Sequence, residues 1–158
     1  MEKFNQNTAR FVHYMRPMTA FDVEHVIAIE LEAYEFPWTR GIIEDCLRVG
    51  YHCFVYEVDN EIRGYGILST VLDEAHLLNI CIAPEFQNQG LGFELMKYLM
   101  SFARSRHAKT FYLEVRMSNS AAIHLYHSMG FNEIGIRENY YPASNGREDA
   151  QLFACELI

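Results

Sequence analysis

Long apolar runs, paired cysteine motifs and an excess of basic charge are all missing from this sequence. Its apolar runs are far shorter than the about 20 residues that cross a membrane, and residues 1–10 have no apolar signal-peptide core. The four cysteines show neither CxxC nor a Cys/His ligand spacing. We therefore expect a soluble, cytoplasmic protein with reduced core cysteines, no metal site and no membrane contact.

Basic residues are outnumbered, because 13 Lys and Arg stand against 21 Asp and Glu, a formal net charge of −8. A generic nucleic-acid binder needs a basic patch that releases counterions, so we expect no direct binding to nucleic acid. The acidity suits a cationic partner, or it serves solubility alone. Half of the 158 residues are hydrophobic, which predicts a single domain over residues 11–158 after a flexible tail at residues 1–10.

Residues 77–102 combine three signals whose order carries chemical meaning. An apolar run of strand length stops before Pro84, which cannot continue a ladder of backbone hydrogen bonds. Apolar residues from Leu91 to Phe102 then recur at helical spacing. The turn at residues 87–92 contains two glycines, and the free N–H groups of a helix N-terminus suit an anion such as pyrophosphate. The alternative is a helix start whose glycines serve only tight packing, since the turn matches no nucleotide-binding fingerprint.

The other periodicities complete a mixed α/β pattern. We expect helices at residues 20–34, 40–49 and 121–129 besides the one that begins at residue 91. Strands are expected at residues 11–18, 52–58, 62–71, 74–83, 110–115, 131–140 and 149–158, with a loop at residues 141–148. Strands separated by a helix run parallel and hairpin neighbours run antiparallel, so the pattern predicts a mixed sheet of about seven strands flanked by about four helices.

Three segments carry a family resemblance. Gln87, Gly90 and Gly92 fit the pattern Gln/Arg-x-x-Gly-x-Gly/Ala, and further motifs lie at residues 113–131 and 137–150. Together they resemble the GNAT superfamily of acetyl-coenzyme A dependent N-acetyltransferases. With residues 36–38 and 72–75, the last motif resembles the bacterial RimI-type ribosomal-protein-alanine N-acetyltransferases.

The resemblance implies acetyl-coenzyme A as co-substrate and no metal. The pantetheine arm would lie along the strand backbone, the pyrophosphate on the turn amides, and the thioester near Asn119. Relatives often carry basic side chains where this chain has Asn88 and Phe93, so we expect phosphate binding to depend more on backbone dipoles. The implied cofactor-binding residues are Ile80, Cys81, Ile82, Gln87, Asn88, Gln89, Gly90, Leu91, Gly92, Phe93 and Asn119.

The same resemblance implies two catalytic residues, Glu114 as general base, directly or through a water molecule, and Tyr126 as general acid. A tyrosine with a pKa of about 10 stays protonated at neutral pH and can donate to a leaving thiolate. A carboxylate at about 4.3 would need burial to become a stronger base. Glu114 paired with Arg116, or Tyr126 in ordinary packing, is the structural alternative. Rival bases are Glu74 and, less so, His76, His124 and His127.

An acceptor is implied as well, the N-terminal alanine of a small-subunit ribosomal protein. The peptide would lie between the segment with Phe36 and Trp38 and the loop with Tyr140 and Tyr141. Three acidic residues could attract the basic tail of this peptide: Glu35, Glu148 and Asp149. The alternative is that they form salt bridges with Arg137 and Arg147. The alternatives are a GNAT enzyme for a small amine and a coenzyme A binding module without turnover. The oligomeric state stays open.

Overall fold

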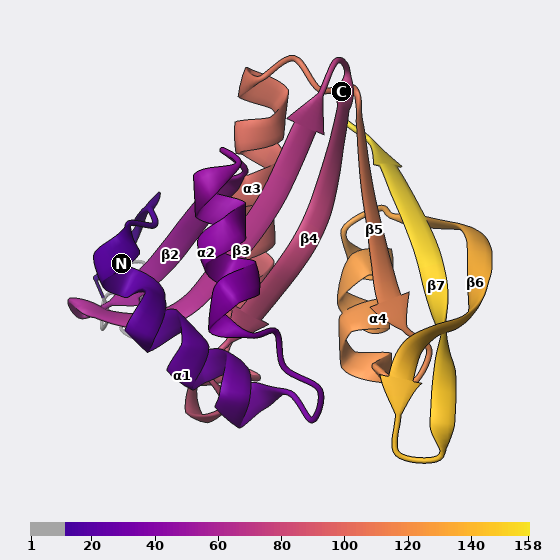
Figure 1. The fold of residues 1–158 in the computed structure, drawn as a ribbon. Coiled ribbons are helices and arrows are strands. Elements are labelled where there is room, and N and C mark those ends of the chain that lie inside the picture. Colours follow the sequence, from indigo (N-terminus) through magenta and orange to yellow (C-terminus); the bar gives the residue numbers. More distant parts are fainter. Residues whose placement is uncertain (1–11) are drawn as a thin grey trace, which may run out of the picture.

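The computed structural model describes residues 12–158 and contains a seven-stranded sheet, four α-helices and two short 3₁₀ helices (Figure 1). The predictions for the tail and for Phe11 fall outside the described residues, and the single-domain assignment stays a prediction. In chain order the elements are β1 His13–Pro17, η1 Ala20–Asp22, α1 Val23–Ala33, α2 Arg40–Arg48, β2 His52–Val58, β3 Glu61–Val71, β4 Glu74–Ile82, η2 Pro84–Phe86, α3 Leu91–Ser105, β5 Thr110–Arg116, α4 Ser120–Ser128, β6 Asn132–Ala143 and β7 Gly146–Glu156.

The predicted mixed sheet is confirmed. Its strand order is β1-β2-β3-β4-β5-β7-β6, and β4 and β5 form the parallel pair at the centre. These two strands pair only through residues 74–76 and 110–112. A register shift in the pairing of β3 with β4, between Ile67 and Leu68, bends β4 near this point. Beyond His76 the two central strands therefore diverge (Figure 1).

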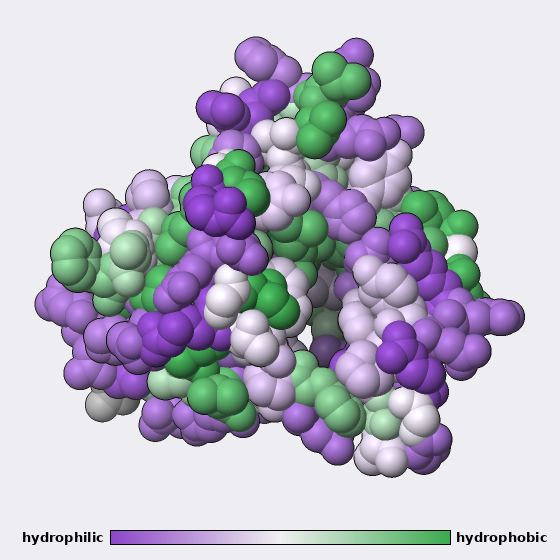
Figure 2. Space-filling view, in the orientation of Figure 1, coloured by the Kyte–Doolittle hydropathy of each residue, from purple (hydrophilic) through white to green (hydrophobic). Residues whose placement is uncertain are grey.

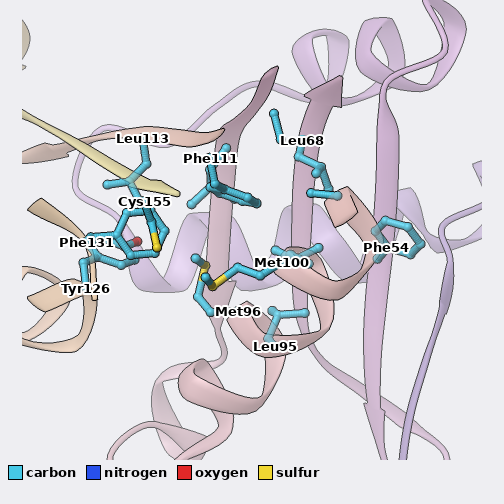
Figure 3. Close-up of a cluster of buried hydrophobic side chains, with 14 of the residues drawn as sticks. Phe54, Leu68, Leu95, Met96, Met100, Phe111, Leu113, Tyr126, Phe131 and Cys155 are labelled. Carbon is cyan, nitrogen blue, oxygen red and sulfur yellow. The ribbon is translucent and has the colours of Figure 1, made fainter. Parts of the chain in front are cut away.

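Helices cover both faces of the sheet. In Figure 1, α1 and α2 lie in front of β2 to β4, while α3 lies behind them and α4 lies behind β5. The rear core joins α3 and α4 to the sheet through residues such as Met96, Phe111 and Phe131 (Figure 3). The front core packs α1 and α2 on the sheet through Val26 and Ile43. Packed helices thus hold both β4 and β5, the two strands that diverge.

Local capping explains where the helices begin and end. The Thr39 side chain accepts a hydrogen bond from the Ile42 N–H and so caps the N-terminus of α2. At Thr19 a capping box with Asp22 is present, but it opens the 3₁₀ helix η1 rather than α1. The predicted helix at residues 20–34 is therefore a 3₁₀ turn followed by α1, and Tyr34 is already extended.

The predicted loop at residues 141–148 is wrong. Tyr141 pairs with Glu148 and Pro142 with Arg147, so β6 and β7 continue to a tight turn. Pro142 is tolerated because β6 is an edge strand. A register shift between Arg137 and Tyr141 bends this hairpin. Of the helices within residues 12–158, none is long and apolar enough to cross a membrane.

Candidate active site

A cavity of about 290 Å³ lies where β4 and β5 diverge. Figure 2 shows a hollow at this place, between the half of the molecule with α1 and the half with β6 and β7. The lining residues come from the end of α1 and the following loop, from β4 and β5, and from α4 and β6. They are Glu30, Tyr34, Phe36, Trp38, Leu77, Leu78, Asn79, Ile80, Glu114, Val115, Arg116, Asn119, Tyr126, Tyr141 and Pro142.

The edge of β4 that faces the cavity offers backbone groups. The Ile80 carbonyl accepts a hydrogen bond from the Tyr34 hydroxyl at 2.5 Å, and the Ile82 carbonyl accepts one from the Gln87 side chain at 2.9 Å. Both carbonyls point away from β3, toward the side that β5 has left. An extended amide-containing arm such as pantetheine fits this edge, because it can pair with β4 as a strand would. The side chains of Cys81 and Ile82 are buried in the two cores.

The turn after η2 ends in the N-terminus of α3. Gly90 precedes Leu91 with a φ of +83°, and Asn88 has a φ of +62°, so the backbone curls there in a way that favours glycine and asparagine. The first N–H groups of a helix have no partner within the helix and carry a partial positive charge. A pyrophosphate group fits this turn, which follows the β4 edge directly.

Glu114 lies on β5 with a side chain that is 15% exposed. Its Oε2 lies 3.2 Å from His76 Nε2, and its Oε1 lies 3.9 Å from the Arg137 guanidinium. The hydrogen bond with His76 lowers the pKa of Glu114, and this effect exceeds the upward effect of burial. Burial therefore does not make Glu114 the stronger base that the sequence analysis required, because a β4 histidine faces the carboxylate.

Tyr126 reaches the cavity from α4 and is 4% exposed. Burial raises the pKa of its hydroxyl, so the group stays protonated and can donate. Its ring packs against Phe131 in the rear core (Figure 3). Asn119 caps α4 by accepting a hydrogen bond from Ala122 N–H at 3.2 Å, and it lines the same cavity. The helix that carries Tyr126 therefore begins at the cavity wall.

Arg116 joins the two predicted acceptor segments. Its guanidinium lies 4.5 Å from the Tyr141 ring centre and 5.4 Å from that of Phe36. It also donates to the Pro142 carbonyl at 2.7 Å and to Glu148 at 3.0 Å. The arginine next to the predicted base thus pairs with Glu148, not with Glu114.

Tyr140 is the predicted acceptor residue that the structure leaves outside the cavity lining. Its side chain is 40% exposed and packs edge-on against Tyr141. The other three, Phe36, Trp38 and Tyr141, do line the cavity. Glu35 lines a neighbouring groove with Arg116, Arg147 and Glu148. Asp149 accepts a hydrogen bond from Asn139 N–H, and Arg147 donates to the carbonyls of Asn139 and Tyr140.

Sequence reasoning missed Glu30, which is 2% exposed at the cavity. Its carboxylate accepts hydrogen bonds from Trp38 N–H at 2.9 Å, from the Asn79 side chain at 3.2 Å and from the Tyr65 hydroxyl. Burial raises the pKa of Glu30 more than these hydrogen bonds lower it. The available signal was a carboxylate that directly follows Ile29 on the buried side of α1.

None of the rival bases lines the first cavity, although His76 contacts Glu114. Glu74 begins β4 and lines a separate cavity together with His76 and Glu114. His124 is exposed on α4, and the His127 ring packs on Phe153 at 5.1 Å. Within residues 12–158 no group of three or more metal-ligating side chains comes together.

A mixed sheet whose parallel pair opens beside a glycine-containing turn at a helix N-terminus is the architecture of an acetyltransferase class. Residues 18–131 match the acetyltransferase (GNAT) family. The chain therefore belongs to the GNAT family of acetyltransferases.

Relatives within the family are similar over most of the chain. The [ribosomal protein bS18]-alanine N-acetyltransferase of Escherichia coli strain K12 is 42% identical over 136 residues, which cover 86% of this chain and 92% of that protein. The crystal structure of the ribosomal-protein-S18-alanine N-acetyltransferase from Escherichia coli has a TM-score of 0.87 at 38% identity and covers 92% of this chain and 94% of that one. A GNAT family acetyltransferase from Elizabethkingia anophelis, with acetyl-CoA bound, has a TM-score of 0.74 at 26% identity over 92% of this chain and 98% of that one.

Proposed function

We propose that this chain transfers the acetyl group of acetyl-coenzyme A to the N-terminal alanine of ribosomal protein bS18. The activity for which the Escherichia coli relative is named, acetylation of the alanine of ribosomal protein bS18, supports the acceptor. One cavity supports the chemistry, because it brings Glu114, Tyr126 and the open edge of β4 to the same space. The cytoplasm, where ribosomes are made, is the compartment we propose.

The β4 edge and the turn would hold the co-substrate. When bound, acetyl-coenzyme A supplies the thioester that the acceptor amine attacks. The backbone of residues 80–82 would align the pantetheine arm, with the Tyr34 hydroxyl giving up its bond to the Ile80 carbonyl. The amides of residues 88–93 would bind the pyrophosphate through the N-terminal dipole of α3.

Glu114 and Tyr126 would move the protons. In its ionised form, which His76 favours, Glu114 takes a proton from the acceptor nitrogen, directly or through a water molecule. The nitrogen lone pair is then free for attack. Tyr126 donates to the leaving thiolate, because its buried hydroxyl remains protonated, and the second proton that the nitrogen loses on forming the amide restores this hydroxyl. The thiol leaves as a neutral group.

An α-amine suits a carboxylate whose pKa is lowered. At pH 7.5 an α-amine with a pKa near 7.9 is roughly a quarter neutral, whereas a lysine near 10.4 is neutral to about one part in a thousand. A protein N-terminus therefore demands less of Glu114 than a lysine side chain does. Phe36, Trp38 and Tyr141 would enclose the first residue of the peptide.

The test uses a short peptide that begins Ala-Arg and carries one internal lysine. We expect one acetyl group, located on the N-terminus by mass spectrometry, and much slower transfer when the N-terminus is blocked. Polyamines and aminoglycosides serve as competing substrates. Acetylation on lysine, or equal rates with free polyamines, would replace this proposal by the small-amine enzyme. Acetyl-coenzyme A binding without any thiol release would favour a binding module.

A further inference from the structure

A second cavity, of about 240 Å³, also reaches Glu114. Its walls come from β4, β5, β6 and β7 and include Glu74, His76 and Arg137. Among the described residues, Glu114 alone lines both this cavity and the one where β4 and β5 diverge. The carboxylate of Glu114 thus lies between the first cavity, which would hold the substrates, and this second cavity.

His76 connects Glu114 to that opening. It is the last β4 residue that pairs with β5, opposite Tyr112, so its ring sits where the two strands part. Its Nε2 lies 3.2 Å from Glu114 Oε2. The His76 side chain is 38% exposed, against 15% for Glu114. The histidine therefore touches both the carboxylate and solvent.

The proton count of the reaction requires such an exit. An ammonium group carries three protons on nitrogen, the amide product keeps one and the thiol takes one, so one proton leaves in each turnover. A proton on Glu114 has no route through the first cavity once the peptide and the acyl donor fill it. In the proposed complex the second cavity holds neither substrate.

We propose that His76 is the proton relay of this acetyltransferase, a positioning residue that takes from Glu114 the proton of the acceptor amine and releases it to water through the second cavity. The inference rests on the proposed role of Glu114 as base. The acceptor nitrogen loses a proton to the Glu114 carboxylate, which becomes a carboxylic acid. With the ring in its Nδ1–H tautomer, the acid passes the proton to Nε2 of His76, and the imidazolium then loses its Nδ1 proton to water. The ring is left with the Nε2–H that donates to the Glu114 carboxylate in the resting enzyme, and exchange with water at the exposed ring returns it to the Nδ1–H tautomer for the next transfer.

The surrounding charges favour this direction. Arg137, from β6, lies 3.9 Å from Glu114 and disfavours a proton on its carboxyl group. Glu74, from β4, lines the second cavity and favours a cation there. Tyr112 and Tyr141, from β5 and β6, are the other titratable side chains near the pair.

The test compares three variants of the full chain, each with a measured melting temperature. His76→Ala leaves room for a small base, and His76→Gln keeps a hydrogen bond to Glu114 without carrying a proton. His52→Ala is the matched control, since His52 is also a half-buried strand histidine that bonds a side chain, Thr70 Oγ1, at 2.8 Å. We measure kcat, both KM values and the effect of added imidazole.

We expect His76→Ala and His76→Gln to lower kcat about tenfold with both KM values unchanged, and His52→Ala to change neither. Imidazole should restore His76→Ala in proportion to its neutral fraction, and it should not restore His76→Gln. Wild-type kcat in His76→Gln, or no restoration of His76→Ala, would overturn the relay. Glu114→Gln separates the two proposals: if it keeps full turnover, the base itself is misassigned, whereas an inactive Glu114→Gln beside fully active His76 variants rejects the relay alone.

Discussion

The two walls of the central cavity are built in opposite ways. The segment that would hold the acyl donor, residues 77–93, is called the donor wall: it is continuous, its residues 77–80 line the cavity, and the rest of β4, the turn and the start of α3 follow them. The acceptor wall consists of the side chains of Phe36, Trp38, Arg116 and Tyr141, which come from three separate segments. Binding to backbone groups depends on the conformation of the chain and tolerates many different side chains. Binding to side chains depends on the identity of each residue that makes a contact.

Long-range contacts hold the acceptor wall in place. Arg116 joins Phe36 to Tyr141, and Glu30 fixes the loop through the Trp38 N–H. The donor wall receives contacts of this kind from Tyr34, which donates to the Ile80 carbonyl, and from Glu30, which accepts from the Asn79 side chain. Substitutions in the donor wall should therefore act mainly through backbone geometry and charge, and those in the acceptor wall through packing.

Gly90→Glu should have the largest effect and abolish detectable acetyl-coenzyme A binding in calorimetry. A side chain at a φ of +83° strains the turn by about 1–2 kcal/mol, and the new carboxylate repels the pyrophosphate. Gly90→Asn is the matched control, because asparagine tolerates this conformation and adds no charge. Undiminished binding in Gly90→Glu would show that the turn is not the anion site.

Glu114→Gln should come next, with turnover lowered about a hundredfold or more and cofactor affinity nearly unchanged. The donor wall holds the co-substrate without this side chain, so binding and catalysis separate. Glu74→Gln, at the other end of the second cavity, should lower turnover much less. The reverse ranking in steady-state kinetics would make Glu74 the base.

The contrast between the walls also explains what the sequence could predict. The strand, turn and helix of the donor wall are contiguous, so apolar spacing and two glycines were enough to locate them. The Thr39 cap is equally local. Contacts between distant residues left no comparable signal, as with His76 and Glu114, which lie 38 residues apart, or Glu30 and Asn79, which lie 49 apart. The loop predicted at residues 141–148 was wrong for the same reason, because turn propensity carries no information on cross-strand pairing at a sheet edge.

Tyr141→Ala should have a smaller effect, on the acceptor wall alone. The variant loses the aromatic face under Arg116, so we expect the KM for peptide to rise roughly three- to tenfold with little change in kcat. Tyr140→Ala is the matched control, since that exposed neighbour lies outside the cavity lining. Equal effects of the two substitutions on KM would mean that the whole hairpin surface, not Tyr141, contacts the peptide.

The smallest effect concerns Glu30 and the pH dependence of stability. Burial raises the pKa of Glu30, so the fold favours its protonated form. The resulting stabilisation is present below the pKa of the unfolded chain and is lost as pH rises through the folded pKa. Glu30→Gln is neutral at every pH. The free energy of unfolding of Glu30→Gln, measured in urea, should therefore increase relative to that of the original chain as the pH is raised from about 5 to about 8.

Glu30→Ala distinguishes the charge from the hydrogen bonds. It leaves the Trp38 N–H, the Asn79 amide and the Tyr65 hydroxyl without their shared acceptor, which should cost about 1–3 kcal/mol of stability at any pH. The loop with Trp38 should loosen as well and raise the KM for peptide, while acetyl-coenzyme A binding stays unchanged. If Glu30→Ala instead weakened acetyl-coenzyme A binding as much as peptide binding, the two walls would be coupled through Glu30 and Asn79, and the separation between backbone and side-chain walls would fail.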